Sequence, residues 1–377
     1  MMRFMSASFR NLLVASWAVV AGATWSRSEA TAGPTMLIDE STGRVIYAEE
    51  PDQSWYPASL TKIMTAYVTF EAIKAGKVKL DTPVPLSEKA RGQPATRIGL
   101  KQGIPLNVEQ ALRGLILRSA NDFAMALAEL IGETEEGFAE KMNATAKRLG
   151  MTRSQFRNPH GLPEPEQFTT ARDLAILATA ILRDFPERTE MFSTMQFVNH
   201  RGTFHSQNDL LRTVDGANGM KTGFTCGAGY NVVATAMRDG RRIIAVVLGE
   251  AQRDERSARA TALLEHGFAV ADWKVALGAP KIEQLDFEPK DANGVHDMSR
   301  VTRTRTCGNS VRRVRSVVAR ARVAPSAPVT AAAVAPAVAA PASTVSVIRP
   351  PSATAAPVAR SPSRTPPGGS AAGGPAN

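Results

Sequence analysis

The sequence predicts an α+β fold in which helices cover an antiparallel β-sheet and a disordered C-terminal tail follows. Three observations carry this prediction: two short β-type runs within 35–49, apolar residues at helical spacing in several segments of 60–184, and three β-type runs within 219–249. A closing helix is expected over about 254–270. We expect the first and last strands to join one sheet.

The first elements are a hairpin and a helix. Met36-Leu37-Ile38 and Val45-Ile46-Tyr47 flank a turn that contains Gly43. Pro57-Ala58-Ser59 then opens a helix, in which apolar residues recur at helical spacing from Leu60 to Ala75.

Loops and small strands are expected over 77–106, which is rich in Pro and Gly. The next helices are expected from the cap Asn107 to about Leu117, from Asp122 through Ile131, over 135–149, and over 169–184 with Thr169 or Thr170 as cap. The later strands are expected over 219–225, 230–237 and 241–249, with Arg238-Asp239-Gly240 turning the last two into a hairpin.

Four regions are expected along the chain. Residues 1–30 carry Arg3 and Arg10 before a short apolar run, and small residues allow cleavage near Ala30 or Ala32, which is typical of a signal peptide. The alternative is an uncleaved membrane anchor. A catalytic domain over 31–272, a linker over 273–299 and a tail over 300–377 then follow.

The tail explains the basic character of the chain. It holds eleven arginines and no acidic residue from Arg300 onward, whereas residues 31–299 carry a net charge of −3. Ala and Pro make up 28 of the 55 residues from 323 to 377, a composition that predicts disorder. The globular part is therefore not expected to bind nucleic acid, and the basic tail is either solvated or in weak contact with anionic cell-envelope surfaces.

Two cysteines, Cys226 and Cys307, are present. In an exported chain they could pair. Because Cys307 lies in a segment with the composition of a disordered tail, and no Leu, Phe, Tyr or Trp follows Phe287, we expect neither a structural disulfide nor a core contribution there. No metal-binding pattern of histidines is present, so no cofactor is expected.

Ser59 and Lys62 form the first candidate catalytic motif. A spacing of three residues places both side chains on one face of a helix, where an amine can take the proton of a hydroxyl. A buried lysine favours the neutral form that this requires. The alternative is an exposed helix start capped by Ser59.

Two further motifs follow in order. Ser119-Ala120-Asn121 lies in a break between two helices, where it could also act only as a helix cap; a similar string, Ser206-Gln207-Asn208, is less favourably placed. Lys221-Thr222-Gly223 lies in a predicted strand, where the cation and hydroxyl could hold a carboxylate. The glycine would allow close backbone approach, and the amide of Phe224 could stabilise an oxyanion.

The three motifs together resemble those of the D-alanyl-D-alanine carboxypeptidases, the low-molecular-mass penicillin-binding proteins of peptidase family S11, whose fold is similar to that of serine β-lactamases. The resemblance covers about 33–270 and includes Asn158-Pro159-His160-Gly161-Leu162. It implies that Ser59 is acylated by a peptidoglycan stem peptide and by β-lactams, with Lys62 as general base. His160 itself is expected to be structural.

The resemblance also implies the remaining roles. Ser119 and Asn121 would relay protons and bind the peptide. The substrate-binding residues would be Lys221, Thr222, Gly223, Phe224 and Arg256. The chain departs from many relatives by Phe224, where they carry histidine, and by a tail without a strand pattern.

The sequence therefore predicts an exported serine D,D-carboxypeptidase of the periplasm or cell envelope. A D,D-endopeptidase with the same residues and a non-catalytic cell-wall-binding protein are the alternatives. A β-lactamase is disfavoured, because the Glu-x-x-Leu-Asn motif of class A is absent.

Overall fold

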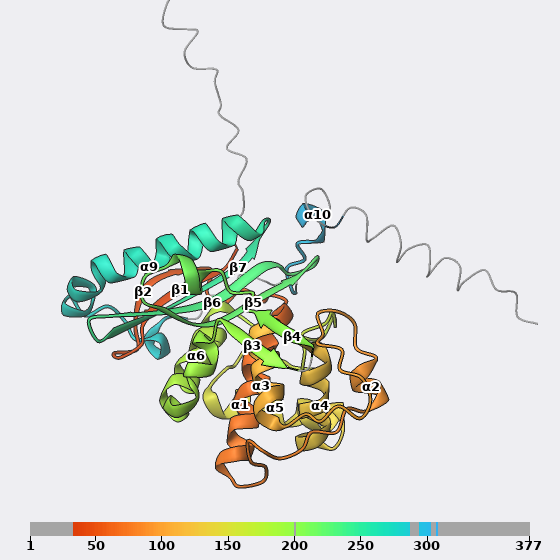
Figure 1. Cartoon of the computed structure of the whole chain (residues 1–377). Helices are drawn as coiled ribbons and strands as arrows, with labels where there is room; N and C mark the ends of the chain where they lie inside the picture. Colours follow the sequence, from red (N-terminus) through yellow and green to blue (C-terminus); the bar gives the residue numbers. More distant parts are fainter. Residues whose placement is uncertain (1–32, 200, 287–293, 303–306, 308–377) are drawn as a thin grey trace, which may run out of the picture. The chain divides into compact units, whose positions relative to one another are not determined.

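The computed structural model of the chain describes residues 33–199, 201–286, 294–302 and 307 (Figure 1). Contacts divide the chain into two units, Met1–Val323 and Ala324–Asn377, and all described residues belong to the first. The expected signal peptide and residues 308–377 of the expected tail lie outside the described residues and stay predictions.

A five-stranded antiparallel sheet forms the centre of the molecule, in the order β2-β1-β7-β6-β5. Its strands are β1 (Thr35–Asp39), β2 (Arg44–Glu49), β5 (Ala217–Thr225), β6 (Gly229–Arg238) and β7 (Arg241–Glu250). β1 pairs with β7, which brings the first and last strands together as the sequence predicts. The predicted α+β architecture is confirmed.

Both faces of the sheet are buried. Along β7, Ile244 and Val246 belong to the core shared with the helical region, whereas Ala245 and Val247 belong to a second core under the closing helix. This alternation follows from the two-residue period of a strand. β5 has a sheet partner on one side only, so it forms one edge of this sheet.

The helices fall into two groups (Figure 1). The long helix α9 (Arg253–Ala276) covers one face of the sheet, and α6 (Ala171–Asp184) packs on the other. The remaining long helices are α1 (Thr61–Lys74), α3 (Val108–Arg118), α4 (Asn121–Gly132) and α5 (Glu135–Leu149). The short elements are α2 (Glu88–Arg91), α7 (Glu190–Ser193), α8 (Leu210–Thr213) and α10 (Ser299–Thr302), the 3-10 turns η1 (Ala58–Leu60), η2 (Pro186–Arg188) and η3 (Ile282–Gln284), and the hairpin β3 (Gln196–Asn199) and β4 (Gly202–His205).

Helix starts follow the predicted caps. The side chain of Asn107 accepts from the amide of Gln110, whose side chain in turn accepts from the amide of Asn107, a reciprocal capping box. Thr170 accepts from the amide of Asp173 in the same way, so it, and not Thr169, caps α6.

The C-terminal segment corrects two expectations. Cys226 and Cys307 form a disulfide, with 6.2 Å between their Cα atoms, where we expected none. Met298 is buried in the larger core, although the composition after Phe287 predicted no core contribution. The reason is that single residues of a polar segment can dock on a surface that the rest of the chain has already formed.

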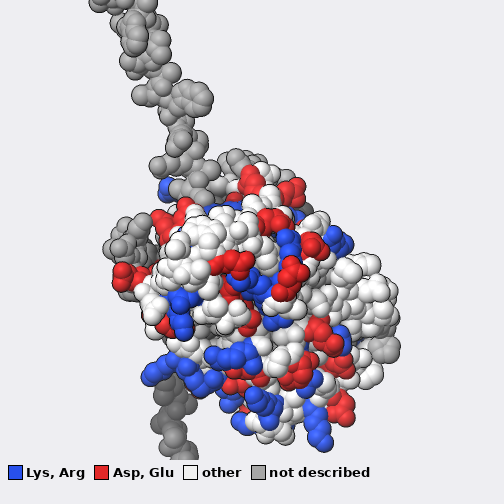
Figure 2. All heavy atoms as spheres, turned by 90° about the vertical axis from the view of Figure 1, so that its left-hand side faces the viewer, with Lys and Arg blue, Asp and Glu red and all other residues white. Residues whose placement is uncertain are grey.

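Charge is mixed on the face shown in Figure 2, where basic and acidic side chains are interspersed. Within the described ranges, no helix combines the length and the apolar character that a membrane crossing requires.

Candidate active site

The turn that carries Ser59 packs directly on the edge strand β5. Ser59 lies in η1 and not in the long helix itself, which begins at Thr61. A Cβ on Gly223 would lie 3.1 Å from the backbone nitrogens of Ser59 and Leu60. That spacing is tighter than side-chain carbons normally adopt, so the glycine of the third motif allows the strand to approach the nucleophile turn.

Lys62 is buried beneath this turn. Its Nζ donates to Ser59 Oγ at 3.1 Å, to Asn121 Oδ1 at 2.7 Å and to the His160 carbonyl at 2.5 Å. Burial lowers the pKa of Lys62 well below its usual value, the charge of Lys221 lowers it further, and Asp122 opposes both. The lowered pKa favours the neutral amine, which can accept a proton from the neighbouring hydroxyl.

The second motif lies on the opposite side of Lys62. Ser119 follows α3 in a left-handed conformation (φ 59°, ψ 36°), and Asn121 begins α4. Neither side chain caps α4, whose N-cap is Ala120, so the alternative of a purely capping role is wrong. Asn121 donates to the Pro94 carbonyl at 3.0 Å, which leaves its oxygen turned to Lys62.

Ser119 Oγ is buried and has no hydrogen-bond partner among the described atoms. An unpaired buried hydroxyl costs free energy, and such costs are typical of functional sites. Ser119 lines the same cavity as Ser59, so a bound substrate can satisfy this hydroxyl.

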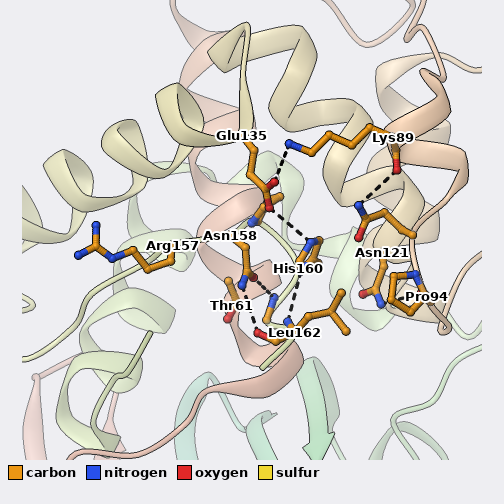
Figure 3. A network of polar contacts seen from close by, with 12 residues as sticks. Thr61, Lys89, Pro94, Asn121, Glu135, Arg157, Asn158, His160 and Leu162 are labelled. Atoms are coloured by element: carbon orange, nitrogen blue, oxygen red, sulfur yellow. Dashed lines mark hydrogen bonds and ion pairs between the residues drawn. The ribbon is translucent and has the colours of Figure 1, made fainter. Parts of the chain in front are cut away.

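The loop 158–162 supplies the third acceptor for Lys62, the His160 carbonyl. Figure 3 shows the polar contacts around Asn158, His160 and Leu162 in this loop. Asn158 accepts from the Gly161 amide and donates to the Leu162 carbonyl, and His160 Nδ1 accepts from the Leu162 amide. His160 Nε2 lies 3.6 Å from a carboxylate oxygen of Glu135. These contacts hold the loop so that the His160 carbonyl points at the lysine.

Burial lowers the pKa of His160 to about 3, with smaller contributions from Lys62 and Lys89. The imidazole is therefore neutral at physiological pH, in line with the expected structural role. The part played by its carbonyl was missed, because side-chain chemistry in a sequence gives no signal for a backbone acceptor.

The third motif lies on β5. Lys221 is buried, and its Nζ donates to the Thr222 carbonyl at 2.8 Å. Burial lowers its pKa to about 7, and the charge of Arg256 contributes in the same direction. Phe224 stacks on Tyr230 with ring centroids 4.1 Å apart, which fixes its aromatic ring at the end of the strand.

A cavity of about 290 Å³ joins these groups. Its walls include Ser59, Ser119, Thr222, Gly223, Phe224 and Arg256, and the further residues Thr96, Gln207, Tyr230 and Arg253. All nine predicted site residues thus lie together, either in the cavity wall or, for Lys62, Asn121 and Lys221, directly behind it. Within the described part of the chain no cluster of three or more potential metal ligands occurs.

Two residues of the cavity wall, Gln207 and Arg253, were not predicted, although each lies next to a motif or residue that was considered. Gln207 belongs to the string Ser206-Gln207-Asn208, which was set aside as a chance match to the second motif; its neighbour Asn208 donates to the Gly219 carbonyl and so supports β5. Arg253 lies one helical turn before Arg256, and both approach Asp209, at 2.5 Å and 3.6 Å.

Arg256 is buried, and burial lowers its pKa to about 10. It still carries a charge at neutral pH. Together with Arg253 it makes the cavity positive, which suits a carboxylate ligand.

Comparison with known proteins points to one family. A family model described as D-alanyl-D-alanine carboxypeptidase matches residues 21–252. D-alanyl-D-alanine carboxypeptidase DacC of Escherichia coli (strain K12) is 40% identical over 240 residues, covering 62% of this chain and 60% of the relative. DacF of Bacillus subtilis (strain 168) is 35% identical over 273 residues, covering 67% and 70%.

Solved structures agree. Penicillin binding protein 5 from Haemophilus influenzae is similar with a TM-score of 0.61 at 38% identity, covering 63% of this chain and 71% of that one. Penicillin-Binding Protein D2 from Listeria monocytogenes, solved in an ampicillin-bound form, gives 0.59 at 30% identity, covering 63% and 97%. The chain spans less than two thirds of the length of the first curated relatives, 60% for DacC and 62% for DacA of Haemophilus influenzae.

Proposed function

Because the chain belongs to the D-alanyl-D-alanine carboxypeptidase family of S11 peptidases, we propose that it is a serine D,D-carboxypeptidase that removes the terminal D-alanine from peptidoglycan stem pentapeptides. The observation that carries this proposal is the 3.1 Å contact between Lys62 Nζ and Ser59 Oγ, with the lysine buried and its pKa lowered. A nucleophile and a base in hydrogen-bond contact are what acyl transfer through a serine requires.

The proposed reaction begins with attack of Ser59 Oγ on the carbonyl carbon of the penultimate D-alanine. The hydroxyl proton passes to the neutral amine of Lys62. We expect the amides of Ser59 and Phe224 to donate to the oxyanion that forms, an assignment supported by the close approach of β5 to the Ser59 turn at Gly223. The peptide C–N bond then breaks and leaves an ester on Ser59.

The released amine takes up the proton that Lys62 accepted. Ser119, which lines the cavity, is suited to deliver this proton, while Asn121 orients Lys62. Water then hydrolyses the ester and restores the hydroxyl of Ser59. Lys221, Thr222 and Arg256 are suited to hold the carboxylate of the terminal D-alanine, because the cavity that they surround is positive.

β-Lactams are proposed to acylate the same serine, a view supported by the ampicillin-bound and cefotaxime-bound forms of Penicillin-Binding Protein D2. An exported location follows from the substrate and agrees with the predicted signal peptide. The weak contact of the basic tail with anionic envelope surfaces stays a prediction, because that tail lies largely outside the described residues.

The test is mass spectrometry of the intact protein after incubation with benzylpenicillin. We expect one covalent adduct on Ser59, no adduct on the folded Ser59→Ala variant, and release of D-alanine from a pentapeptide by the unmodified enzyme. An adduct at another residue, or none on folded protein, would contradict the proposal. Faster cleavage of a cross-linked dimer than of the pentapeptide would point to endopeptidase activity instead.

A further inference from the structure

A second cavity, of about 540 Å³, adjoins the one that contains Ser59. Consecutive residues line the two: Ser59 lines the first and Tyr56–Ala58 the second, and Phe224 lines the first and Thr225–Gly227 the second. Residues of the loop 161–167 and of the segment 294–302 complete the wall. A ligand that extends along β5 past the nucleophile therefore passes from one cavity into the other.

The edge position of β5 gives such a ligand a template. Within the described sheet, β5 pairs with β6 alone, so its other edge can pair with an extended peptide. β5 ends at Thr225, and the chain turns at 226–228 into β6. Because a strand rises about 3.3 Å per residue, the second cavity begins about one residue of extended chain beyond Phe224. If the terminal carboxylate of a bound peptide lies beside Arg256, the residue that precedes its C-terminal D-Ala-D-Ala pair reaches the second cavity.

The two cavities differ in the sign of their charge. The charged residues that line the first are Arg253 and Arg256, whereas those that line the second are Glu164 and Asp297, and no lysine or arginine lines it. The site thus complements a peptide with a carboxylate at its end and a cation further back. We call the second one the acidic cavity.

Asp297 is held in place by several independent contacts of its segment. His296 stacks on Trp55 with ring centroids 4.8 Å apart, and the Met298 amide donates to the Gly227 carbonyl at 2.8 Å. Asp297 Oδ1 accepts from the Ser299 amide at 2.8 Å.

The same segment is also tied to the end of β5. The Thr302 hydroxyl donates to the Cys226 carbonyl at 2.7 Å, and the disulfide joins Cys226 to Cys307. This segment lies beyond residues 21–252, the part that matches the family model, so one wall of the acidic cavity is a feature that the family match does not cover.

Resting on the proposed function, we infer that the acidic cavity binds a side-chain amine on the substrate residue that precedes the scissile D-Ala-D-Ala pair, and that Glu164 and Asp297 determine this specificity. Both residues line this cavity, where their carboxylates can give an ammonium group charge-assisted hydrogen bonds. A neutral side chain at the same position gains none.

The test compares two peptides that differ only in this charge: Nα-acetyl-Lys-D-Ala-D-Ala and its Nε-acetylated form. We expect Glu164→Gln combined with Asp297→Asn to raise KM for the free-amine peptide about fivefold, while kcat and both constants for the acetylated peptide change less than about twofold. Glu166→Gln is the matched control, because Glu166 lies on the same loop but pairs with Arg157 and does not line the cavity.

Equal changes for both peptides, or no change for either, would overturn the inference. Acylation of the double variant by benzylpenicillin at the rate of the unmodified enzyme shows that the variant is folded and that the Ser59 machinery is intact. If the unmodified enzyme forms no penicillin adduct and releases no D-alanine from either peptide, the proposed function itself fails and this inference fails with it.

Discussion

The side-chain nitrogen of Lys62 lies 3.1 Å from the hydroxyl oxygen of Ser59, and its two other hydrogen-bond partners are oxygens that can only accept. The amide oxygen of Asn121 and the carbonyl of His160 orient the amine, and burial disfavours its charged form. In the proposed mechanism, this arrangement performs the task that a histidine performs in other serine hydrolases.

Replacing Lys62 by arginine is expected to abolish most of the acylation. The guanidinium of arginine stays protonated, because its pKa lies far above neutrality, and it therefore cannot accept the proton of Ser59. We expect acylation by benzylpenicillin to slow by about 10³-fold, within the range typical of a lost general base. Rapid-quench mass spectrometry measures the rate, and an unchanged circular dichroism spectrum excludes misfolding; a rate within about tenfold of the original would contradict the role.

The pH dependence of kcat/KM is expected to fall on its alkaline side because of Lys221. Its pKa is lowered to about 7, so the cation that we propose to hold the substrate carboxylate is present below that pH and lost above it. Lys62 works in the opposite sense, because it must be neutral to accept a proton, and its lowered pKa favours that form.

The measurement is kcat/KM for a D-Ala-D-Ala peptide from about pH 6 to about pH 9, with a fall approaching tenfold per pH unit above about 7. Lys221→Arg retains its charge over this range and should move the alkaline fall to higher pH. An alkaline limb that is the same in the variant would show that another group titrates.

Gly223→Ala tests the contact between β5 and the nucleophile turn. The new methyl group would lie 3.1 Å from two backbone nitrogens, which cannot move aside as a flexible side chain would. We expect acylation to slow by at least about tenfold while the melting temperature falls by only a few degrees. Acylation at the original rate would show that the turn tolerates displacement.

The sequence predicted the parts of this structure that local patterns determine. Periodic apolar residues located α1 and α3–α6 to within a few residues. The motifs of Ser59 and Ser119 lie at the start or end of these helices, whereas the motif of Lys221 lies within the strand β5. The other features of the site depend on long-range packing, which local sequence patterns do not encode. Nothing local indicates that Gln207 reaches the cavity or that the His160 carbonyl orients Lys62, since both depend on loops that cross from elsewhere in the chain.

The segment around Asp297 is the clearest case. It contains no Leu, Phe, Tyr or Trp, and it is held by one buried methionine, one stacked histidine, hydrogen bonds to Ser54, Gly227 and Cys226, and one disulfide. Sparse contacts of this kind have no periodic signature. The same sparseness means that the disulfide should contribute much of the energy that keeps the segment docked.

Cys307→Ser is therefore expected to destabilise the protein and to weaken its preference for an amine-bearing substrate. The disulfide joins residues 81 apart in the sequence, and a crosslink over such a loop typically contributes about 2–4 kcal/mol to the free energy of unfolding. Urea denaturation with and without reductant measures this contribution: the reduced unmodified protein should match the variant, and the oxidised protein should unfold at higher urea. Acylation by benzylpenicillin should change by less than about twofold, because the hydrogen bonds that join Lys62 to Ser59, Asn121 and His160 do not involve the described segment 294–302. Coincident urea curves for the oxidised protein and the variant would show instead that the docked segment adds nothing to stability.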